Sequence, residues 1–328
     1  MKLLILIHHP FALWSAPDWL GKRVHRDFPQ IEVDQRNSYK NVEEHIRDAE
    51  IFFGWSLRGE QVAAAKKLRW IHSTAAAVHQ LMSPELRASN VNVTNASSVH
   101  GPVVAEHAIA MMFALAKRLH VAVRAQQQRI WAQEQISFGE PRPTELAGST
   151  LGLIGYGAIG RPIAESAKAL GMRVLVVRQH PQERGGNDGI TFFDPGGLDE
   201  VIAQSEFLIL AAPTTKKTQR LINGERFARM KPNAYLVNVS RGALIDEAAL
   251  LDTLRSHRIG GAALDVFDHE PLPADSPLWA LDNLLITPHT AATSDKMWER
   301  HYALIKENLR RYLGGEPLLG LVDKQSGY

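Results

Sequence analysis

Short apolar runs alternate with stretches of helical periodicity along the whole chain. In the first hundred residues, the apolar runs predict five strands, over residues 2–7, 31–35, 51–54, 70–73 and 91–94. Helical patterns lie between these runs, for example over residues 42–48 and 58–67. This alternation is typical of a parallel sheet with helices on both faces.

An apolar segment over residues 103–119 follows, and we expect it to form a long buried helix with Pro102 at its start. A loop rich in glycine and proline, residues 138–148, ends this segment. Six more apolar runs then predict strands, over residues 151–154, 173–177, 207–210, 234–239, 261–264 and 284–286. Helical patterns separate these runs, and an amphipathic helix is expected over residues 296–313. Six strands with crossover helices are the content of a complete dinucleotide-binding domain.

The composition fits two globular domains, because 45% of the 328 residues are hydrophobic and 22% are charged. The 37 basic and 35 acidic residues nearly cancel, so we expect neither a nucleic-acid partner nor a membrane-surface partner. The absence of cysteine excludes disulfides, thiolate metal sites and a thiol nucleophile. The N-terminal apolar run is too short for a signal peptide, and no run approaches the ~20 apolar residues of a membrane helix. We therefore expect a cytoplasmic protein.

A glycine-rich turn stands between a predicted strand and a predicted helix. Residues 155–160 form the sequence Gly-Tyr-Gly-Ala-Ile-Gly, which matches the pattern of a dinucleotide-binding turn. In that role Gly155 permits the tight turn, Gly157 lets the backbone approach a pyrophosphate, and Gly160 lets the helix pack closely on the strand. The N-terminus of the helix would bind the phosphates. An ordinary glycine-rich turn and an S-adenosylmethionine site remain alternatives for this pattern.

The residue expected near the adenosine ribose is Arg178, which lies 18 positions after Gly160 at the end of the next predicted strand. An acidic residue at this place usually indicates NAD, whereas a guanidinium suits a ribose 2′-phosphate through charge-assisted bonds. The sequence therefore favours NADP(H), with NAD(H) as the alternative cofactor. Stacking of Arg178 on the adenine, or an exposed position in solvent, would also fit the pattern.

Four side chains with acid–base or anion-binding chemistry follow the later predicted strands. They are Arg241, Asp265, Glu270 and His289. Because ligands of open α/β sheets bind at the carboxyl ends of the strands, we expect these side chains to converge beside the cofactor. Taken singly, each has an ordinary alternative, such as a surface arginine, a solvated glutamate or a histidine that caps a helix.

These motifs together resemble the NAD(P)-dependent D-2-hydroxyacid dehydrogenase family, with glyoxylate and hydroxypyruvate reductases among its members. The resemblance rests on the glycine turn, on Asn-Val-Ser-Arg-Gly at 238–242, on Asp-Val-Phe-x-x-Glu-Pro at 265–271 and on Thr-Pro-His at 287–289. It implies a Rossmann-type doubly wound parallel sheet domain, residues 99–289, inserted in a smaller flavodoxin-like α/β domain, residues 1–98 plus 290–328. It also implies a homodimer, with the long helix and its continuation at the interface.

The resemblance implies roles for single residues in the reduction of a 2-oxo acid. His289 would donate the proton, Glu270 would orient His289, and Arg241 would polarise the keto oxygen and bind the substrate carboxylate. Asp265 would hold the nicotinamide carboxamide. The full set of cofactor-binding residues that the resemblance implies is Gly155, Gly157, Ala158, Ile159, Gly160, Arg178, Gln179, Ala212, Pro213, Thr218, Val239, Ser240, Arg241, Asp265, His289 and Ala292.

The chain departs from the family at the loop that anchors the substrate carboxylate. The family has a Gly-x-Gly-Val-Asp-like turn, whereas residues 73–79 of this chain are Ser-Thr-Ala-Ala-Ala-Val-His. The backbone amides of Ala76, Ala77 and Val78 are expected to bind the substrate together with Arg241 and His289. The departure leaves the substrate open among glyoxylate, hydroxypyruvate and an aryl-pyruvate. Trp298 fits either a pocket wall or the core, and no histidine has the spacing of a metal site.

Two other functions fit the same fold. Formate dehydrogenase has glutamine where Glu270 stands, so this residue argues against that activity. A nucleotide-sensing, corepressor-like interaction protein would not need the set Arg241, Glu270 and His289. The intact set favours the 2-oxo acid reductase.

Overall fold

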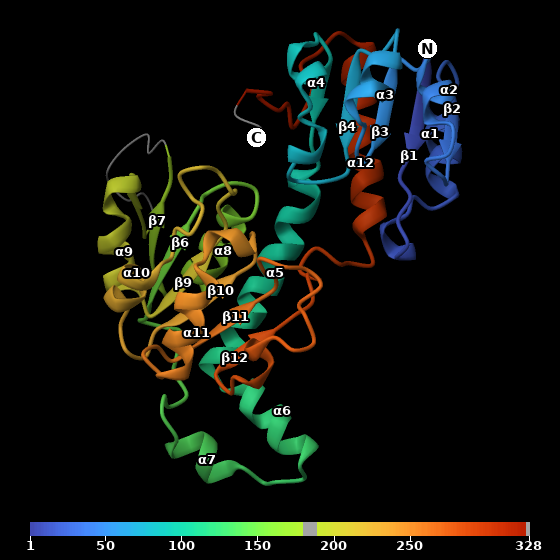
Figure 1. Cartoon of the computed structure of the whole chain (residues 1–328). Coiled ribbons are helices and arrows are strands. Elements are labelled where there is room, and N and C mark those ends of the chain that lie inside the picture. The colour runs from blue at the N-terminus through green and yellow to red at the C-terminus, as the bar shows by residue number, and fades with distance from the viewer. Residues whose placement is uncertain (180–188, 326–328) are drawn as a thin grey trace. The chain divides into compact units, whose positions relative to one another are not determined.

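The computed structural model describes residues 1–179 and 189–325 (Figure 1). The chain divides into two compact units. The first comprises Met1–His100 and Ser294–Tyr328, and the second comprises Gly101–Thr293. Each unit is built around one parallel sheet.

The first unit has a five-stranded sheet in the order β2-β1-β3-β4-β5, and every neighbouring pair is parallel. Its strands are β1 Lys2–Leu6, β2 Glu32–Arg36, β3 Ile51–Gly54, β4 Trp70–Ser73 and β5 Asn92–Thr94. Its helices are α1 Trp19–Asp27, α2 Val42–Ile46, α3 Gly59–Ala64, α4 Pro84–Ala88 and α12 Met297–Leu313. Helices α1 and α12 pack on one face of the sheet, and α2, α3 and α4 supply apolar side chains to the other. This strand order is the flavodoxin-like one.

The second unit has a seven-stranded parallel sheet in the order β12-β11-β10-β9-β6-β7-β8. Its strands are β6 Thr150–Ile154, β7 Arg173–Val177, β8 Ile190–Phe193, β9 Phe207–Leu210, β10 Tyr235–Asn238, β11 Gly261–Leu264 and β12 Leu284–Ile286. The strand order reverses between β6 and β9, which makes the sheet doubly wound. The expected Rossmann-type fold class is therefore confirmed.

The prediction of six strands in this part of the chain is wrong, because the described residues form seven. Strand β8, Ile190–Phe193, lies at the edge of the sheet, and only Ile190 among its four residues is fully buried. Its sequence, Ile-Thr-Phe-Phe, is only four residues long, and Thr191 interrupts the apolar run. The pattern is therefore weaker than that of the central strands, and the strand was missed.

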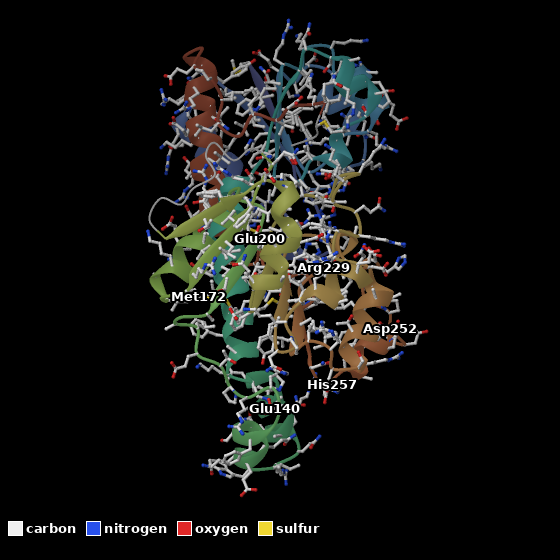
Figure 2. All side chains as sticks on the ribbon, turned by 90° about the vertical axis from the view of Figure 1, so that its left-hand side faces the viewer. Glu140, Met172, Glu200, Arg229, Asp252 and His257 are labelled. Carbon is white, nitrogen blue, oxygen red and sulfur yellow. The ribbon has the colours of Figure 1, made fainter. Side chains whose placement is uncertain are left out.

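Helices cover both faces of the seven-stranded sheet. The helices of this part of the chain are α5 Ser97–Ala116, α6 Leu119–Gln127, α7 Gln133–Phe138, α8 Gly160–Ala169, α9 Leu198–Gln204, α10 Gly224–Arg229 and α11 Glu247–Arg255. Helices α5 and α8 pack on one face, and α9, α10 and α11 pack on the other. The outer sides of α9, α10 and α11 carry exposed charged residues such as Glu200, Arg229 and Asp252 (Figure 2).

Helix α5 begins six residues before the expected segment and ends three residues before its expected end. Pro102, expected at the start, is the sixth residue of the helix. At this place the missing N–H removes a single backbone bond in the second turn, so the helix tolerates it. Residues 97–101 are Ser-Ser-Val-His-Gly, and Val99 is the only apolar side chain among them, so the sequence pattern did not indicate that the helix begins at Ser97. The helix stops before Arg118, whose φ is +54°, and α6 begins at Leu119.

Helix α5 also corrects the expectation that no stretch is long and apolar enough to cross a membrane. Its 20 residues meet that criterion by length and composition. Yet most of this helix is buried inside the chain, where α5 packs against the sheet. A buried core helix meets the same criterion, so this is weak evidence for a membrane span.

Three buried histidines lie together in the first unit. His72 of β4 is 0% exposed, His100 of α5 is 7% exposed and His301 of α12 is 2% exposed. The rings of His100 and His301 are 5.3 Å apart, and each of the three has one ring nitrogen without a hydrogen-bond partner among the described residues. Burial lowers the pKa of all three, to about 3 for His72, and Arg300 also lowers the pKa of His100.

We expect this cluster to make the first unit sensitive to acid. A histidine with a depressed folded-state pKa binds its proton more readily when unfolded, so stability is lost as the pH falls below about 6.5. For His72 alone, the loss between pH 7 and pH 5 is about 2 kcal/mol. Urea denaturation followed by circular dichroism at both pH values measures it. His72→Gln should show a smaller decrease of the urea midpoint than the wild type, and an equal decrease in both proteins would contradict the prediction.

Candidate active site

The residues expected to bind the cofactor lie in loops that follow the strands of the seven-stranded sheet. All of these strands are parallel, so their carboxyl ends lie along one edge of the sheet. The loops and the expected residues that they carry are as follows: after β6, Gly155, Gly157, Ala158, Ile159 and Gly160; after β7, Arg178 and Gln179; after β9, Ala212, Pro213 and Thr218; after β10, Val239, Ser240 and Arg241; after β11, Asp265; after β12, His289 and Ala292. The loops after β6 and β9 lie where the strand order reverses, which is the usual ligand position in such sheets.

The glycine turn has the geometry of a phosphate cradle. Gly155 has φ of +101°, and a Cβ there would lie 2.6 Å from the Ala211 carbonyl oxygen. A Cβ on Gly160 would lie 2.1 Å from the Gly155 carbonyl oxygen. A Cβ on Gly157, by contrast, would meet no described atom within 4 Å. The chain's own packing thus requires glycine at positions 155 and 160, while Gly157 leaves open space at the N-terminal end of α8, where a pyrophosphate fits.

The loop after β9 is closed by one threonine. Thr218 donates from its hydroxyl to the Pro213 carbonyl at 2.7 Å and accepts from the Thr215 N–H at 2.7 Å. These bonds fix the turn over residues 213–218 beside the glycine turn. The Thr218 side chain therefore shapes the loop.

Arg241 is placed by two features of the chain. The Asn238 side chain donates to the Arg241 carbonyl at 2.9 Å and accepts from the Ser240 N–H at 3.0 Å, so it closes the turn after β10. A Cβ on Gly242 would lie 2.0 Å from the Phe267 carbonyl carbon, so only glycine lets the two loops approach this closely. Burial lowers the pKa of Arg241, and the charge of Glu270 opposes this effect.

His289 and Glu270 form a hydrogen-bonded pair. The distance from His289 Nδ1 to Glu270 Oε2 is 2.6 Å, and the other carboxylate oxygen of Glu270 accepts from the Phe267 N–H at 2.9 Å. The bond to Glu270 raises the pKa of His289 above its usual value, against the opposing effect of burial. Burial alone would raise the pKa of Glu270, but the bonds from His289 and Phe267 outweigh it and lower this pKa. The pair therefore favours a protonated imidazole beside an ionised carboxylate.

Asp265 holds the loop that carries His289. Its carboxylate is 1% exposed and accepts from the Thr287 hydroxyl at 2.6 Å and from the backbone N–H groups of Thr290 and Ala291 at 2.9 and 3.0 Å. Both carboxylate oxygens are thus used within the chain. The expected contact of Asp265 with a nicotinamide carboxamide would have to share these oxygens.

Three residues that support the site were missed as functional positions by the sequence analysis. Asn238 and Thr287 lie inside quoted motifs, but nothing in the sequence indicated the hydrogen bonds that they make. His107 of α5 lies 3.0 Å from the Thr287 hydroxyl and 3.6 Å from the Asp265 carboxylate. Its partners stand more than 150 positions later in the chain, so no local pattern indicated this contact.

Arg178 follows β7, and its backbone N–H donates to the Phe193 carbonyl at 3.0 Å. Its guanidinium carbon lies 4.4 Å from the centroid of the Phe192 ring and 5.8 Å from that of Tyr156. Its Nε atom is buried and has no hydrogen-bond partner among the described residues. The guanidinium therefore lies over two aromatic rings, beside the glycine turn.

The residues expected to bind substrate through their amides lie in the first unit, in the loop after β4. Ala76 and Ala77 are half-buried, and Val78 is buried. The Asn95 side chain donates to the Ala76 carbonyl at 3.1 Å and holds this loop to the segment after β5. Trp298 packs against the core of this unit and donates from its indole N–H to the Leu13 carbonyl at 3.0 Å.

The pair of His289 and Glu270 leads to a pH prediction. Glu270→Gln removes the carboxylate that raises the pKa of His289, so this pKa should fall toward its usual value. A step that needs protonated His289 is lost as the pH rises through this pKa, so the loss should occur at lower pH in the variant. The measurement is kcat/KM for 2-oxo acid reduction between pH 5 and 9. A profile that does not move would show that Glu270 does not control His289.

The chain is similar to known proteins of one family. The family model for the NAD-binding domain of the D-isomer specific 2-hydroxyacid dehydrogenases matches residues 109–291. The glyoxylate reductase of Pyrococcus furiosus is 34% identical over 264 residues, which cover 80% of this chain and 77% of that protein. The D-3-phosphoglycerate dehydrogenase of Methanocaldococcus jannaschii is 32% identical over 88% of this chain, which spans 54% of that protein's length.

A similar solved structure is that of a D-isomer specific 2-hydroxyacid dehydrogenase from Xanthobacter autotrophicus Py2, in complex with NADPH and MES. It aligns with a TM-score of 0.82 and 28% identity over 99% of both chains. The family model covers more than half of the chain, and the Pyrococcus relative exceeds 30% identity over most of both proteins. The chain therefore belongs to the D-isomer specific 2-hydroxyacid dehydrogenase family.

Proposed function

We propose that this protein is an NAD(P)-dependent D-2-hydroxyacid dehydrogenase that interconverts a 2-oxo acid and its D-2-hydroxy acid. The observation that carries the proposal is the hydrogen bond of 2.6 Å between His289 and Glu270, in the same row of loops as Arg241 and the glycine turn. A proton donor whose pKa is raised, a carboxylate that orients it and a partly buried guanidinium are the groups that carbonyl reduction needs.

When bound, the nicotinamide ring would supply a hydride to the keto carbon in reduction, or accept one in the reverse direction. Side chains of this protein would stabilise the charge that develops on the keto oxygen and donate the proton that neutralises it. Arg241 would stabilise the negative charge that develops on the keto oxygen, and protonated His289 would donate a proton from Nε2 to that oxygen. Glu270 would hold the other ring nitrogen and stabilise the charged imidazole before the transfer.

We assign cofactor binding to residues 99–289 and substrate binding to residues 1–98 plus 290–328. The amides of Ala76, Ala77 and Val78 would bind the substrate carboxylate. None of these three amides donates a backbone hydrogen bond among the described residues, which supports the assignment. We also propose that the protein acts in the cytoplasm.

NADP(H) is the cofactor that we favour, because Arg178 stands beside the glycine turn without an ion-pair partner among residues 1–179 and 189–325. A guanidinium there suits a ribose 2′-phosphate. The structure from Xanthobacter autotrophicus contains NADPH, which agrees with this preference. The substrates to test first are glyoxylate, hydroxypyruvate and an aryl-pyruvate.

The experiment that tests the proposal is a panel of 2-oxo acids with NADPH and NADH in parallel, followed by absorbance at 340 nm. We expect turnover of at least one member, with a higher kcat/KM for NADPH. Cofactor binding without turnover across a broad panel would contradict the proposal and would favour the nucleotide-sensing interaction protein.

We also propose that the protein is a homodimer. Figure 1 shows α6 and α7 extending away from the sheet of the second unit, and this segment carries the exposed apolar side chains Ile130 at 54%, Trp131 at 89% and Phe138 at 70%. Apolar surface of this kind marks an interface. Light scattering should give twice the chain mass of 36.4 kDa for the wild type and the single mass for Trp131→Asp with Phe138→Asp. A monomeric wild type, or a dimeric variant, would contradict the proposal.

A further inference from the structure

Two aromatic rings and two guanidinium groups lie together beside the glycine turn. Tyr156 is the second residue of this turn, and its ring meets the ring of Phe192 in β8 at a centroid distance of 4.9 Å and an angle of 77°. The guanidinium carbon of Arg178 lies 4.4 Å from the centroid of Phe192 and 5.8 Å from that of Tyr156. The guanidinium carbon of Arg161, at the start of α8, lies 5.4 Å from the centroid of Tyr156.

Neither of the two cations is neutralised within the described part of the chain. Arg161 and Arg178 form no ion pair with a described carboxylate, and the buried Nε of Arg178 has no acceptor there. Tyr156 and Phe192 are both half-buried, so the rings themselves are fixed by packing. Two unpaired positive charges held on one aromatic platform form a site for an anion.

The arrangement also explains how Arg178 is ordered without a salt bridge to any carboxylate of the described residues. A guanidinium stacked on a ring face keeps its in-plane N–H donors free for another group. An arginine side chain loses considerable rotamer freedom when it is fixed, and a receptor that is already ordered avoids this cost on binding. Tyr156 contacts both cations, whereas Phe192 contacts Arg178 at the shorter distance.

We propose that Tyr156 and Phe192 are specificity-determining residues, because their rings hold Arg178 and Arg161 as a preformed receptor for a ribose 2′-phosphate. The inference rests on the proposed function, in which this edge of the sheet binds NADP(H). It adds that the preference depends on the aromatic pair as well as on the arginine. The ligand class is an adenosine nucleotide with a phosphomonoester on the 2′-oxygen.

Calorimetric binding of two nucleotide fragments tests the inference without any turnover. The probes are 2′,5′-ADP, which carries the 2′-phosphate, and 5′-AMP, which lacks it. In the wild type, we expect 2′,5′-ADP to bind at least tenfold more tightly than 5′-AMP. Tyr156→Ala and Phe192→Ala should each weaken the binding of 2′,5′-ADP about five- to tenfold. The affinity for 5′-AMP should change less than twofold in both variants. Tyr156→Phe keeps the ring and should bind both probes like the wild type.

Each outcome either supports the inference or overturns it. If the wild type prefers 2′,5′-ADP and the alanine variants keep the full preference, the aromatic pair does not determine specificity and the inference is wrong. If Tyr156→Phe weakens the binding of 2′,5′-ADP as much as Tyr156→Ala does, the tyrosine hydroxyl and not the ring supports this binding. The inference is again wrong in that case. If the wild type does not distinguish the probes, the NADPH preference is wrong as well, while turnover with NADH would still support the dehydrogenase function.

Discussion

Replacing His289 with asparagine is expected to lower kcat for 2-oxo acid reduction by about 10²–10⁴-fold, the usual contribution of a positioned general acid. The variant removes the imidazole that is hydrogen-bonded to Glu270 at 2.6 Å and leaves no group to protonate the keto oxygen. Asparagine is the suitable replacement because His289 has φ of +53°, a conformation that asparagine adopts more readily than alanine. Steady-state kinetics with the best substrate of the panel measure the loss.

The chain offers a matched control for this substitution. His257 is exposed, has φ of +48° and lies in the loop before β11, away from the carboxyl ends of the strands (Figure 2). His257→Asn should keep kcat within about twofold, as is typical of a surface substitution. Cofactor binding to His289→Asn, measured by calorimetry, should stay within a few-fold of the wild type. If His289→Asn keeps most of the wild-type kcat, His289 is not the proton donor.

The sequence was sufficient to predict the central strands and the order in which the site motifs follow them. Strands buried on both faces form continuous apolar runs, so β6, β7 and β9 were readily found by their pattern. The edge strand β8 was not found, because it is only four residues long and Thr191 interrupts its apolar run. The first turns of α5 were missed for a related reason, since residues 97–101 carry no apolar period.

The candidate site was predictable as far as it depends on strand ends. Arg241, Asp265 and His289 each follow a strand, and a parallel sheet brings strand ends to one edge. The hydrogen bonds that connect these loops were not predictable from the sequence. Asp265 reaches Thr287 and the loop after it across more than 20 positions, and both of its carboxylate oxygens accept hydrogen bonds there. Such bonds depend on tertiary geometry, which local periodicity does not report.

The surroundings of the site residues shift their pKa values in different directions. Glu270 raises the pKa of His289, and burial lowers the pKa of Arg241 while Glu270 opposes that effect. Glu270 therefore stabilises both positive charges, one through a hydrogen bond and one through space. With Glu270 ionised, the two cations and the carboxylate can accept a substrate carboxylate and a developing oxyanion without a large excess of either charge.

Arg241→Ala should accordingly lower kcat/KM for the 2-oxo acid by about 10³-fold, because one group serves both the substrate carboxylate and the keto oxygen in the proposed mechanism. Arg241→Lys should lie between the wild type and the alanine variant, since an ammonium keeps the charge but loses the planar pair of donors. Glu270 would keep its bond to His289 in both variants, so the pH at which activity is lost should move little. Initial rates over a range of substrate concentrations separate the effects on kcat and KM.

Arg229→Ala provides the control for the loss of an exposed guanidinium. Arg229 ends α10 on the outer surface and lies 3.8 Å from Asp199, a distance at which an exposed pair contributes little to stability (Figure 2). Its kcat/KM should stay within about twofold of the wild type, as for other surface substitutions. If kcat/KM falls no further in Arg241→Ala than in Arg229→Ala, Arg241 has no role in the mechanism. The amides of Ala76, Ala77 and Val78 alone would then bind the substrate carboxylate. Substitutions in the loop after β4 would be expected to lower kcat/KM instead.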